Sequence, residues 1–544
     1  MDNANNEGDA MKTKGSWPVL LAAAVGLTMA GCSGGGGDDG PDKELRQKIQ
    51  ARGLKGDPAE GRVIGNITDP LPALGKHLFF TKAVSANLDT ACVTCHHPFF
   101  GGGDNLAIPV GVDAVDPALF GPGRIRANKG PTQSPPFGIG DPPMPRNSPT
   151  VFGLAFWDKS ITWDGTVFSE RGTPGTSGAD SRIIAPLDTP PVTGMLTNPN
   201  INTANAIPYE QKFDSAMSVS AGHGLFPGSV RPAMRDGGFS TLTTDLAVRQ
   251  RIAARIGNYG AGAGELPTNN WLPLFRAAFN DNTSTPEQLV TANNISKAIA
   301  AYERTQTFTE TPWKKYVKGD DNAITPAQKR GALLFYRTIA EGGGNCASCH
   351  SGDFFTDEEY WVLAVPQIGR GKADANSATD TNDDWGRGHV TLADADKWAY
   401  RTPTLLNVEV TGPYGHTGVF PTLEGIIRHH LNAEASVNAF NFNTVSTAAG
   451  PINMTNAQAH TQLALTRLKA QRAANLPRVL RDANLTDANV ADLVEFMKAL
   501  TDPCTKDRTC LAKWVPTAAD PNPDGLRICP KDNTGALLSP GTCQ

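Results

Sequence analysis

Two short runs of the sequence decide the fold: Cys92-Val93-Thr94-Cys95-His96 and, in the second half of the chain, Cys346-Ala347-Ser348-Cys349-His350. In each run two thiols stand three positions apart, so each can form a thioether bond to one vinyl group of the same haem. The adjacent histidine then lies under the haem iron as its proximal ligand. The sequence therefore predicts two covalently bound haem c groups, one held by Cys92, Cys95 and His96 and the other by Cys346, Cys349 and His350.

Two other uses of a Cys-x-x-Cys pair explain these runs less well. A zinc site needs two further ligands for each pair at a similar spacing. A thioredoxin-like redox pair has no need of the histidine that follows. Covalent haem accounts for all three residues of both runs.

The N-terminus carries signs of export. Lys12 and Lys14 precede an apolar run over residues 17–30, which is too short to span a bilayer and is typical of a signal peptide. The small residues before Cys32 resemble a bacterial lipoprotein signal, in which the cysteine becomes the acylated first residue of the mature protein. A plain secretory signal is the alternative. We expect a periplasmic protein, anchored to the bacterial outer membrane only through a lipid at Cys32.

The composition of the 544-residue chain is that of a globular protein, with 39% hydrophobic and 19% charged residues. The net charge of −5 argues against nucleic acid as a partner. The 56 glycines and 41 prolines predict long loops. Four cysteines remain near the C-terminus, and in an exported protein they predict two disulfides with three open pairings: Cys504, Cys510, Cys529 and Cys543.

The sequence before each haem run is repeated. Gly75 is followed by the aromatic pair Phe79-Phe80, and Gly331 by the pair Phe335-Tyr336. Thr325 and Pro326 are typical of a helix start before the second pair. Each half therefore predicts a short helix that ends in an aromatic pair above its haem.

Helical periodicity recurs elsewhere, and strand signals are few and short. It appears over residues 246–256, 293–308, 423–431 and 487–500. We predict a mostly α fold with two cytochrome c-like helical domains, long Pro/Gly-rich loops and one covalent haem in each domain. The predicted parts are a signal and flexible tether (1–41), an N-terminal haem domain (42–290), a C-terminal haem domain (291–500) and a Cys-rich tail (501–544).

Over roughly residues 65–500 the sequence resembles the bacterial di-haem cytochrome c peroxidase family, which includes the MauG-type di-haem oxidases. Besides the haem runs, the resemblance is carried by seven segments: Leu74–Phe80, Arg146–Thr150, Trp163–Gly165, Ala298–Arg304, Asp384–Arg387, Arg401–Leu405 and Thr411–Gly418. It implies an oxidoreductase with two haem c groups, a peroxidatic N-terminal domain and an electron-transferring C-terminal domain.

The resemblance also implies a calcium ion between the haems. The matching ligands are the side chain of Asn147 and the carbonyl groups of Thr411 and Pro413, and oxygen ligands suit this hard cation. A turn or loop role is the alternative for these three residues. Trp163 matches the tryptophan that carries electrons between the haems in the family, although a core tryptophan is the simpler alternative.

The resemblance places the sixth ligand of the C-terminal haem on the helix after Tyr414–Gly418. Peroxidases of the family have methionine there and MauG-type enzymes have tyrosine, whereas His430 matches the position here. His429 is the alternative, because neighbouring helix residues point about 100° apart and only one of them can face the iron. We predict bis-histidine ligation by His350 and His430, which lowers the reduction potential relative to methionine ligation.

The N-terminal haem is the expected site of peroxide chemistry, with His96 as its proximal ligand. Some family members cap this iron with a second histidine soon after the haem run. No histidine lies between His97 and His223 here, and His97 adjoins the proximal ligand. We therefore expect a five-coordinate or water-bound iron, with His223 as one candidate distal group.

A distal glutamate moves the peroxide proton in the family, and the match for it departs from the pattern. One alignment puts Ala233 at its position and another puts Val192 there. Asp236, Asp188 or His223 are the candidates to replace it.

The leading hypothesis is a lipid-anchored periplasmic peroxidase that reduces hydrogen peroxide to water. A small cytochrome c or cupredoxin supplies electrons, which enter at the C-terminal haem and reach the N-terminal haem through Trp163. The first alternative is a MauG-like oxidase of a partner protein's aromatic residues. The second is a non-enzymatic di-haem electron carrier, in line with the missing distal glutamate. Homodimers are frequent in the family, but this sequence carries no dimer signature of its own.

Overall fold

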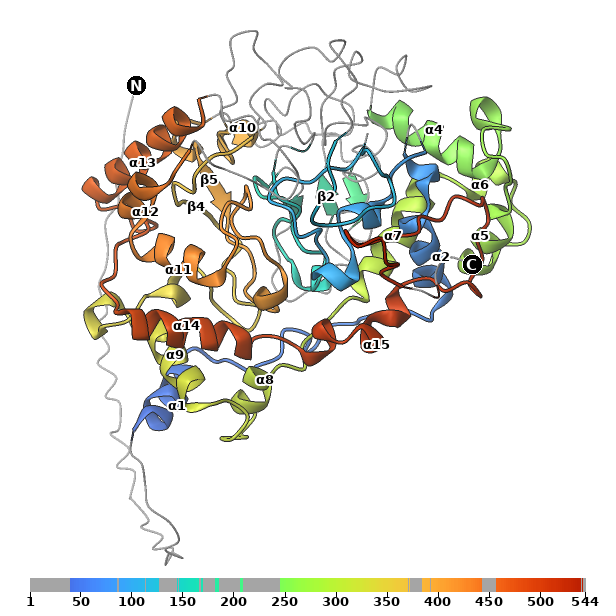
Figure 1. Cartoon of the computed structure of the whole chain (residues 1–544). Coiled ribbons are helices and arrows are strands. Elements are labelled where there is room, and N and C mark those ends of the chain that lie inside the picture. The colour runs from blue at the N-terminus through green and yellow to red at the C-terminus, as the bar shows by residue number, and fades with distance from the viewer. Residues whose placement is uncertain are drawn as a thin grey trace, which may run out of the picture. The chain divides into compact units, whose positions relative to one another are not determined.

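The computed structural model describes residues 40–85, 88–112, 114–126, 144, 146–165, 168–169, 182–184, 206–208, 245–369, 371, 384–391, 393–442, 456–539 and 541. Residues Gly40–Gln544 form one compact unit (Figure 1). Several predictions lie outside the described residues: the signal and tether with Cys32, the distal candidates Asp188, Val192, His223, Ala233 and Asp236, and the tail residue Cys543.

The structure is mainly helical, as predicted, with two cytochrome c-like halves. The helices are α1 (Pro41–Ala51), α2 (Pro70–Phe80), α4 (Asp245–Gly257), α5 (Trp271–Phe279), α6 (Pro286–Leu289), α7 (Ala292–Arg304), α8 (Pro312–Val317), α9 (Pro326–Tyr336), α10 (Gly388–Thr391), α11 (Leu423–Leu431), α12 (Ala433–Ala439), α13 (Ala457–Ala473), α14 (Asp487–Ala499) and α15 (Arg508–Leu511).

Two small antiparallel sheets accompany the helices. The first is formed by β1 (Phe168–Ser169), β2 (Arg182–Ile184) and β3 (Ala206–Pro208), in that order. The second pairs β4 (Tyr360–Val362) with β5 (Ala399–Arg401), and Trp361 faces Tyr400 across the pair.

Local sequence signals place most helix ends correctly. Thr325 caps α9 and forms a capping box with Gln328, as the Thr-Pro start predicts. The predicted helix over 293–308 ends earlier, at Arg304. Phe308 still packs into the core against Phe152, with ring centroids 4.4 Å apart. Its apolar character thus reflects burial of a loop residue rather than a further helical turn.

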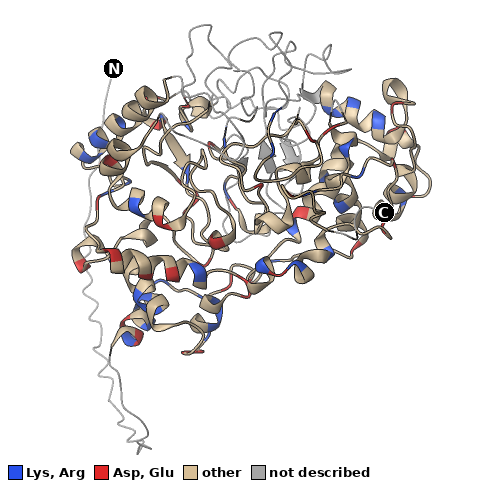
Figure 2. Cartoon of the chain, viewed as in Figure 1, with Lys and Arg blue, Asp and Glu red and all other residues tan. Residues whose placement is uncertain are grey.

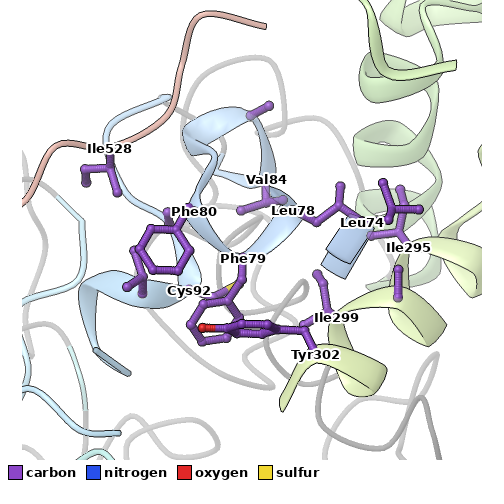
Figure 3. Close-up of a cluster of buried hydrophobic side chains, with 14 of the residues drawn as sticks. Leu74, Leu78, Phe79, Phe80, Val84, Cys92, Ile295, Ile299, Tyr302 and Ile528 are labelled. Carbon is purple, nitrogen blue, oxygen red and sulfur yellow. The ribbon is translucent and has the colours of Figure 1, made fainter. Parts of the chain in front are cut away.

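The first helix pair is α2 against α7. A Cβ added at Gly75 would lie 1.8 Å from the carbonyl oxygen of Ala298, so only glycine permits this crossing. One turn later, the rings of Phe79 and Tyr302 meet with centroids 4.9 Å apart. Figure 3 shows this contact beside Cys92 of the first haem run. The repeated Gly and aromatic positions therefore serve the closest approach of two helices.

The second helix pair, α9 against α14, has the same construction. A Cβ at Gly331 would lie 1.9 Å from the carbonyl oxygen of Asp492. The rings of Phe335 and Phe496 then meet with centroids 5.3 Å apart. Both helix pairs bring their aromatic residues into a fully buried core next to a haem run.

The two hydrophobic cores draw on segments from both sides of residue 290, which is the predicted boundary between the haem domains. Helix α7 belongs to the core of the first half, while Leu45 and Ile49 of α1 belong to the core of the second half. The boundary itself stays a prediction. The core of each half therefore contains a helix from the other side of the predicted boundary, α7 in the first core and α1 in the second.

The C-terminal tail packs on the first half. Trp514 and Ile528 are part of the first core, and Arg527 forms a β-bridge with Thr81 at the end of α2. Cys504 and Cys510 form a disulfide, and Cys529 is also disulfide-bonded. The tail thus contributes to the wall behind the first haem run.

Charged residues are interspersed over α1, α9 and α14 (Figure 2). They form ion pairs between these helices, such as Lys329 with Asp42 at 2.8 Å and Arg330 with Asp492 at 2.7 Å. Each of these pairs has one largely buried partner, and ion pairs near the surface contribute about 1 kcal/mol or less. No helix in the described part of the chain has the length and apolarity needed to cross a membrane.

Candidate functional site

One cavity joins the two haem runs. Its volume is about 410 Å³, and its wall is mostly apolar. Residues of both runs line it: Cys92, Cys95, His96, Cys346, Cys349 and His350. A volume of this size is usual for a cofactor or ligand site.

The first haem run begins as a short 3-10 helix, Cys92–Thr94, and His96 follows it. Nδ1 of His96 hydrogen-bonds the carbonyl oxygen of Gly102 at 3.2 Å, and the Pro149 carbonyl is a second acceptor near the ring. Burial lowers the pKa of His96 to about 4, so the ring is neutral at pH 7. The Nδ1 hydrogen bond leaves Nε2 as the nitrogen with a free lone pair, which is the form that binds a metal.

The second haem run repeats this arrangement. Nδ1 of His350 hydrogen-bonds the carbonyl oxygen of Phe355 at 3.1 Å, and the Pro403 carbonyl is again a second acceptor. Burial, with a smaller effect from the neighbouring His430, lowers the pKa of His350 to about 4. Both histidines are therefore fixed in the same tautomer and face the same cavity.

The segments behind these histidines form a repeat that the sequence analysis missed. Thr150 follows Pro149, and its hydroxyl donates to the carbonyl oxygen of Gly101 at 2.6 Å, behind His96. In the same way Thr404 follows Pro403, and its hydroxyl donates to the carbonyl oxygen of Phe354 at 2.5 Å, behind His350. The sequence signal for this repeat is the Pro-Thr pair that follows both haem runs at the same spacing along the chain.

The residues present fit covalent haem. None of the four cysteines of the two runs is bonded in a disulfide. Within the described residues, no three His, Cys, Asp or Glu side chains are grouped so that they could hold a metal.

His430 on α11 faces the cavity, and its neighbour does not. Nδ1 of His430 hydrogen-bonds the carbonyl oxygen of Ile426 at 2.8 Å, and the ring centroid lies 6.5 Å from that of His350. Two imidazoles on opposite sides of one metal are separated by roughly 6 Å, from two bonds of about 2 Å each plus the ring radii. His429 uses both nitrogens elsewhere, Nδ1 with Ser436 at 3.0 Å and Nε2 with the Leu363 carbonyl at 2.9 Å.

The structure brings Trp163, Asn147 and Pro413 together at the cavity. Nε1 of Trp163 donates to the carbonyl oxygen of Asn147 at 2.9 Å, and the Asn147 amide donates to that of Pro413 at 2.8 Å. Thr411 lines the same cavity, and its hydroxyl donates to the Val408 carbonyl at 3.3 Å. The four residues singled out from the family pattern are thus neighbours in space.

A buried charge cluster adjoins these residues. The Arg146 guanidinium contacts the carboxylates of Asp384 at 2.6 Å and Asp164 at 2.8 Å. Burial raises the pKa of the Asp384 carboxyl, but the charge and hydrogen bonds of Arg146 outweigh this and hold it well below its usual range. The ring of Tyr400 stacks on His416 with centroids 3.6 Å apart. The sequence pattern marked most of these residues as family motifs without indicating that they meet.

His97 does not reach the cavity. Its ring lies among phenylalanines, with Phe99 at 5.1 Å and Phe100 at 5.6 Å between centroids. Nδ1 accepts from the backbone N–H of Phe99 at 3.0 Å, and burial lowers the pKa of His97 to about 3. This position agrees with the expectation that His97 cannot act on the distal side of the iron.

Comparisons with known proteins give the family. A family model described as "Di-haem cytochrome c peroxidase" matches residues 70–234. The cytochrome-c peroxidase IdrP1 of Pseudomonas sp. (strain SCT) is 30% identical over 376 residues, which are 65% of this chain and 70% of that protein. The methylamine utilization protein MauG of Methylorubrum extorquens is 26% identical over 368 residues, which are 67% of this chain and 69% of that protein.

A solved structure of the diheme peroxidase BthA from Burkholderia thailandensis aligns with 86% of this chain and 94% of its own, at 19% identity and a TM-score of 0.43. The family assignment rests on the cytochrome-c peroxidase IdrP1, which is 30% identical and of which this chain covers 70%. The chain belongs to the di-haem cytochrome c peroxidase family, as its sequence motifs predict. It is an oxidoreductase, and its two haem runs correspond to the two haem c groups of the family.

Proposed function

We propose that this protein reduces hydrogen peroxide to water with electrons from a small cytochrome c or cupredoxin, passed from the C-terminal to the N-terminal haem site. The observation that carries this proposal is the single cavity lined by both haem runs and by Trp163. Haem iron, when bound, supplies the redox chemistry. The protein contributes the proximal ligands, their orientation and an apolar surrounding.

The ligand sets of the two sites are proposed to differ. His350 and His430 form a bis-histidine pair, in support of which their rings are separated by the distance that a shared metal requires. His96 is the proximal ligand of the other site, which we propose to be open for peroxide. This difference assigns the binding of peroxide to the N-terminal site and electron entry to the C-terminal site.

Trp163 is the proposed bridge between the sites. Replacement by phenylalanine keeps an aromatic ring but removes the indole N–H bond to Asn147. We expect peroxide turnover with a reduced donor to fall roughly tenfold or more, or at least about 1.4 kcal/mol in the barrier. The measurement is steady-state oxidation of reduced cytochrome c by peroxide, with both haems counted by their optical spectrum.

Trp361→Phe is the matched control for this prediction. Trp361 also lines the cavity and also donates its indole N–H, to Asp357 at 2.9 Å. Its replacement should leave turnover within twofold of the parent. Equal losses in the two variants would contradict the bridge, and an absence of donor-dependent peroxide reduction in the parent protein would contradict the proposed function.

We also propose calcium at Asn147, Thr411 and Pro413. The amide of Asn147 already points at the Pro413 carbonyl, and rotating the amide by half a turn presents Oδ1 at the same place. An amide oxygen with two carbonyl oxygens is a fitting partial shell for calcium. Because the ion would stabilise only the folded state, chelation should lower the Tm of the holoprotein.

The test is elemental analysis with thermal unfolding in the presence and absence of a chelator. The parent protein should hold one calcium per chain, and Asn147→Ala should lose both the ion and the effect of the chelator. Asn322→Ala, at an exposed loop position, should retain both. A parent protein that contains no calcium and ignores the chelator would refute this site.

A MauG-like oxidase is the second candidate function, favoured by histidine rather than methionine at position 430 and by the relatives named MauG. It would draw electrons from aromatic residues of a partner protein. Peroxide added without donor would then leave a long-lived state oxidised by two electrons, whereas a peroxidase needs its donor to complete the cycle. We further propose export to the periplasm with a lipid at Cys32, on the pattern of residues 12–32.

A further inference from the structure

The cavity contains one acidic residue among the described residues that line it, Glu303. Its side chain is 1% exposed and belongs to α7, directly after Tyr302. In the sequence, Glu303 stands out only as part of the family segment Ala298–Arg304.

The internal repeat defines the counterpart of Glu303 in the second half. Gly75 approaches Ala298 and Tyr302 of α7, and Gly331 approaches Asp492 and Phe496 of α14 in the same way. A Cβ at either glycine would lie 2.8 Å from the Cβ of the aromatic residue. Tyr302 therefore corresponds to Phe496.

A second, independent pair of contacts has the same register. The backbone N–H of Gly153 donates to the carbonyl oxygen of Gln306 at 2.9 Å, and that of Asn407 donates to that of Leu500 at 2.9 Å. Gln306 follows Tyr302 by the same number of residues as Leu500 follows Phe496. Glu303 thus corresponds to Met497, which is 4% exposed and also lines the cavity.

Glu303 lies near the wall that carries His96. Helix α7 contacts the short 3-10 helix Leu154–Phe156. The chain just before this helix supports the proximal loop, because the N–H of Val151 donates to the Gly102 carbonyl that also accepts from His96. The equivalent wall of the second half has a thioether instead of a carboxylate.

We propose that Glu303 lowers the reduction potential of the N-terminal haem. The C-terminal haem experiences no such effect, because the corresponding residue, Met497, is uncharged. The effect of Glu303 requires its carboxyl to be ionised in the holoprotein: a carboxylate there would stabilise the more positive, oxidised iron, and the low local dielectric would strengthen the interaction. The two haem sites thus have similar walls but differ in charge at one corresponding position, Glu303 in the first half and Met497 in the second. This inference rests on the proposed binding of one haem c at each run, but not on turnover of peroxide.

The experiment is a spectroelectrochemical titration of the two haems in the holoprotein, with the haems distinguished by their optical and electron paramagnetic resonance signatures. Glu303→Gln and Glu303→Met should each raise the equilibrium constant for reduction of the N-terminal haem by at least tenfold, which is a rise of 59 mV in its potential for one electron. The same constant for the C-terminal haem should stay within twofold of the parent value. Met497→Glu should shift the C-terminal haem in the opposite direction.

Glu310→Gln is the charge-matched control, since Glu310 is exposed and pairs with Lys314 on the surface. It should change the equilibrium constant for reduction of neither haem by more than twofold. An unchanged N-terminal potential in both Glu303 variants, or an equal shift of both haems, would overturn the proposal. Shifted potentials in a protein that does not reduce peroxide would leave this inference standing and remove the proposed function.

Discussion

His430→Ala is expected to abolish the low-spin signal of the C-terminal haem. The ring of His430 is held by its Nδ1 bond to Ile426 and lies 6.5 Å from that of His350. The neighbouring His429 uses both ring nitrogens in other hydrogen bonds. Loss of a strong axial ligand leaves a high-spin iron. Resting-state electron paramagnetic resonance should therefore show only high-spin haem, and donor-driven turnover should fall roughly tenfold or more.

Two further variants sharpen this prediction. His430→Met should restore a low-spin haem at a higher potential than in the parent, because methionine ligation favours reduced iron. His429→Gln should keep the low-spin signal and reduce stability by about 1–3 kcal/mol, since it disturbs the buried bonds to Ser436 and Leu363. A low-spin signal that survives in His430→Ala and disappears in His429→Gln would reverse the ligand assignment.

Gly75→Ala and Gly331→Ala are expected to destabilise the protein strongly. The added Cβ would lie within 2 Å of a backbone carbonyl oxygen in each case, so the helices must separate. Overpacking against a flexible side chain typically costs 1–3 kcal/mol, and a backbone contact leaves less room to adjust. We expect a loss of about 4 kcal/mol or more, measured by thermal or denaturant unfolding of the holoprotein.

Gly65→Ala is the control for both changes. A Cβ at Gly65 would meet nothing closer than 3.7 Å, so stability should stay within about 0.5 kcal/mol of the parent. Haem content should also fall in the Gly75 and Gly331 variants, because each crossing positions the aromatic pair next to a haem run. Stabilities equal to that of Gly65→Ala would show that the crossings tolerate separation.

Short-range patterns in the sequence were enough to predict several features. The two haem runs, the cap of α9 at Thr325 and the bounds of α11 all follow from residues a few positions apart. Such features depend on bonds and backbone geometry within one or two turns of the chain. The mostly α fold follows for the same reason, since helical periodicity is a local property.

Other features required the packing of distant segments. The helix α7 completes the first core although it follows the predicted domain boundary, and the tail residue Arg527 pairs with Thr81. The pattern left His429 and His430 as alternatives, because a helix face has meaning only relative to its neighbours. The hydrogen bonds of His429 to Ser436 and Leu363 show which of the two rings turns away from the cavity.

The correspondence of Glu303 with Met497 illustrates the same division. Neither residue belongs to a recognisable repeat in the sequence, since the surrounding helices α7 and α14 share little identity. Their equivalence appears only in the tertiary structure. Each helix packs against a glycine of its partner helix, and a carbonyl oxygen just after each helix accepts a hydrogen bond from a corresponding loop. Covalent chemistry is encoded by spacing along the chain and is readable there, whereas the electrostatic environment of each haem site arises from side chains that only folding brings together.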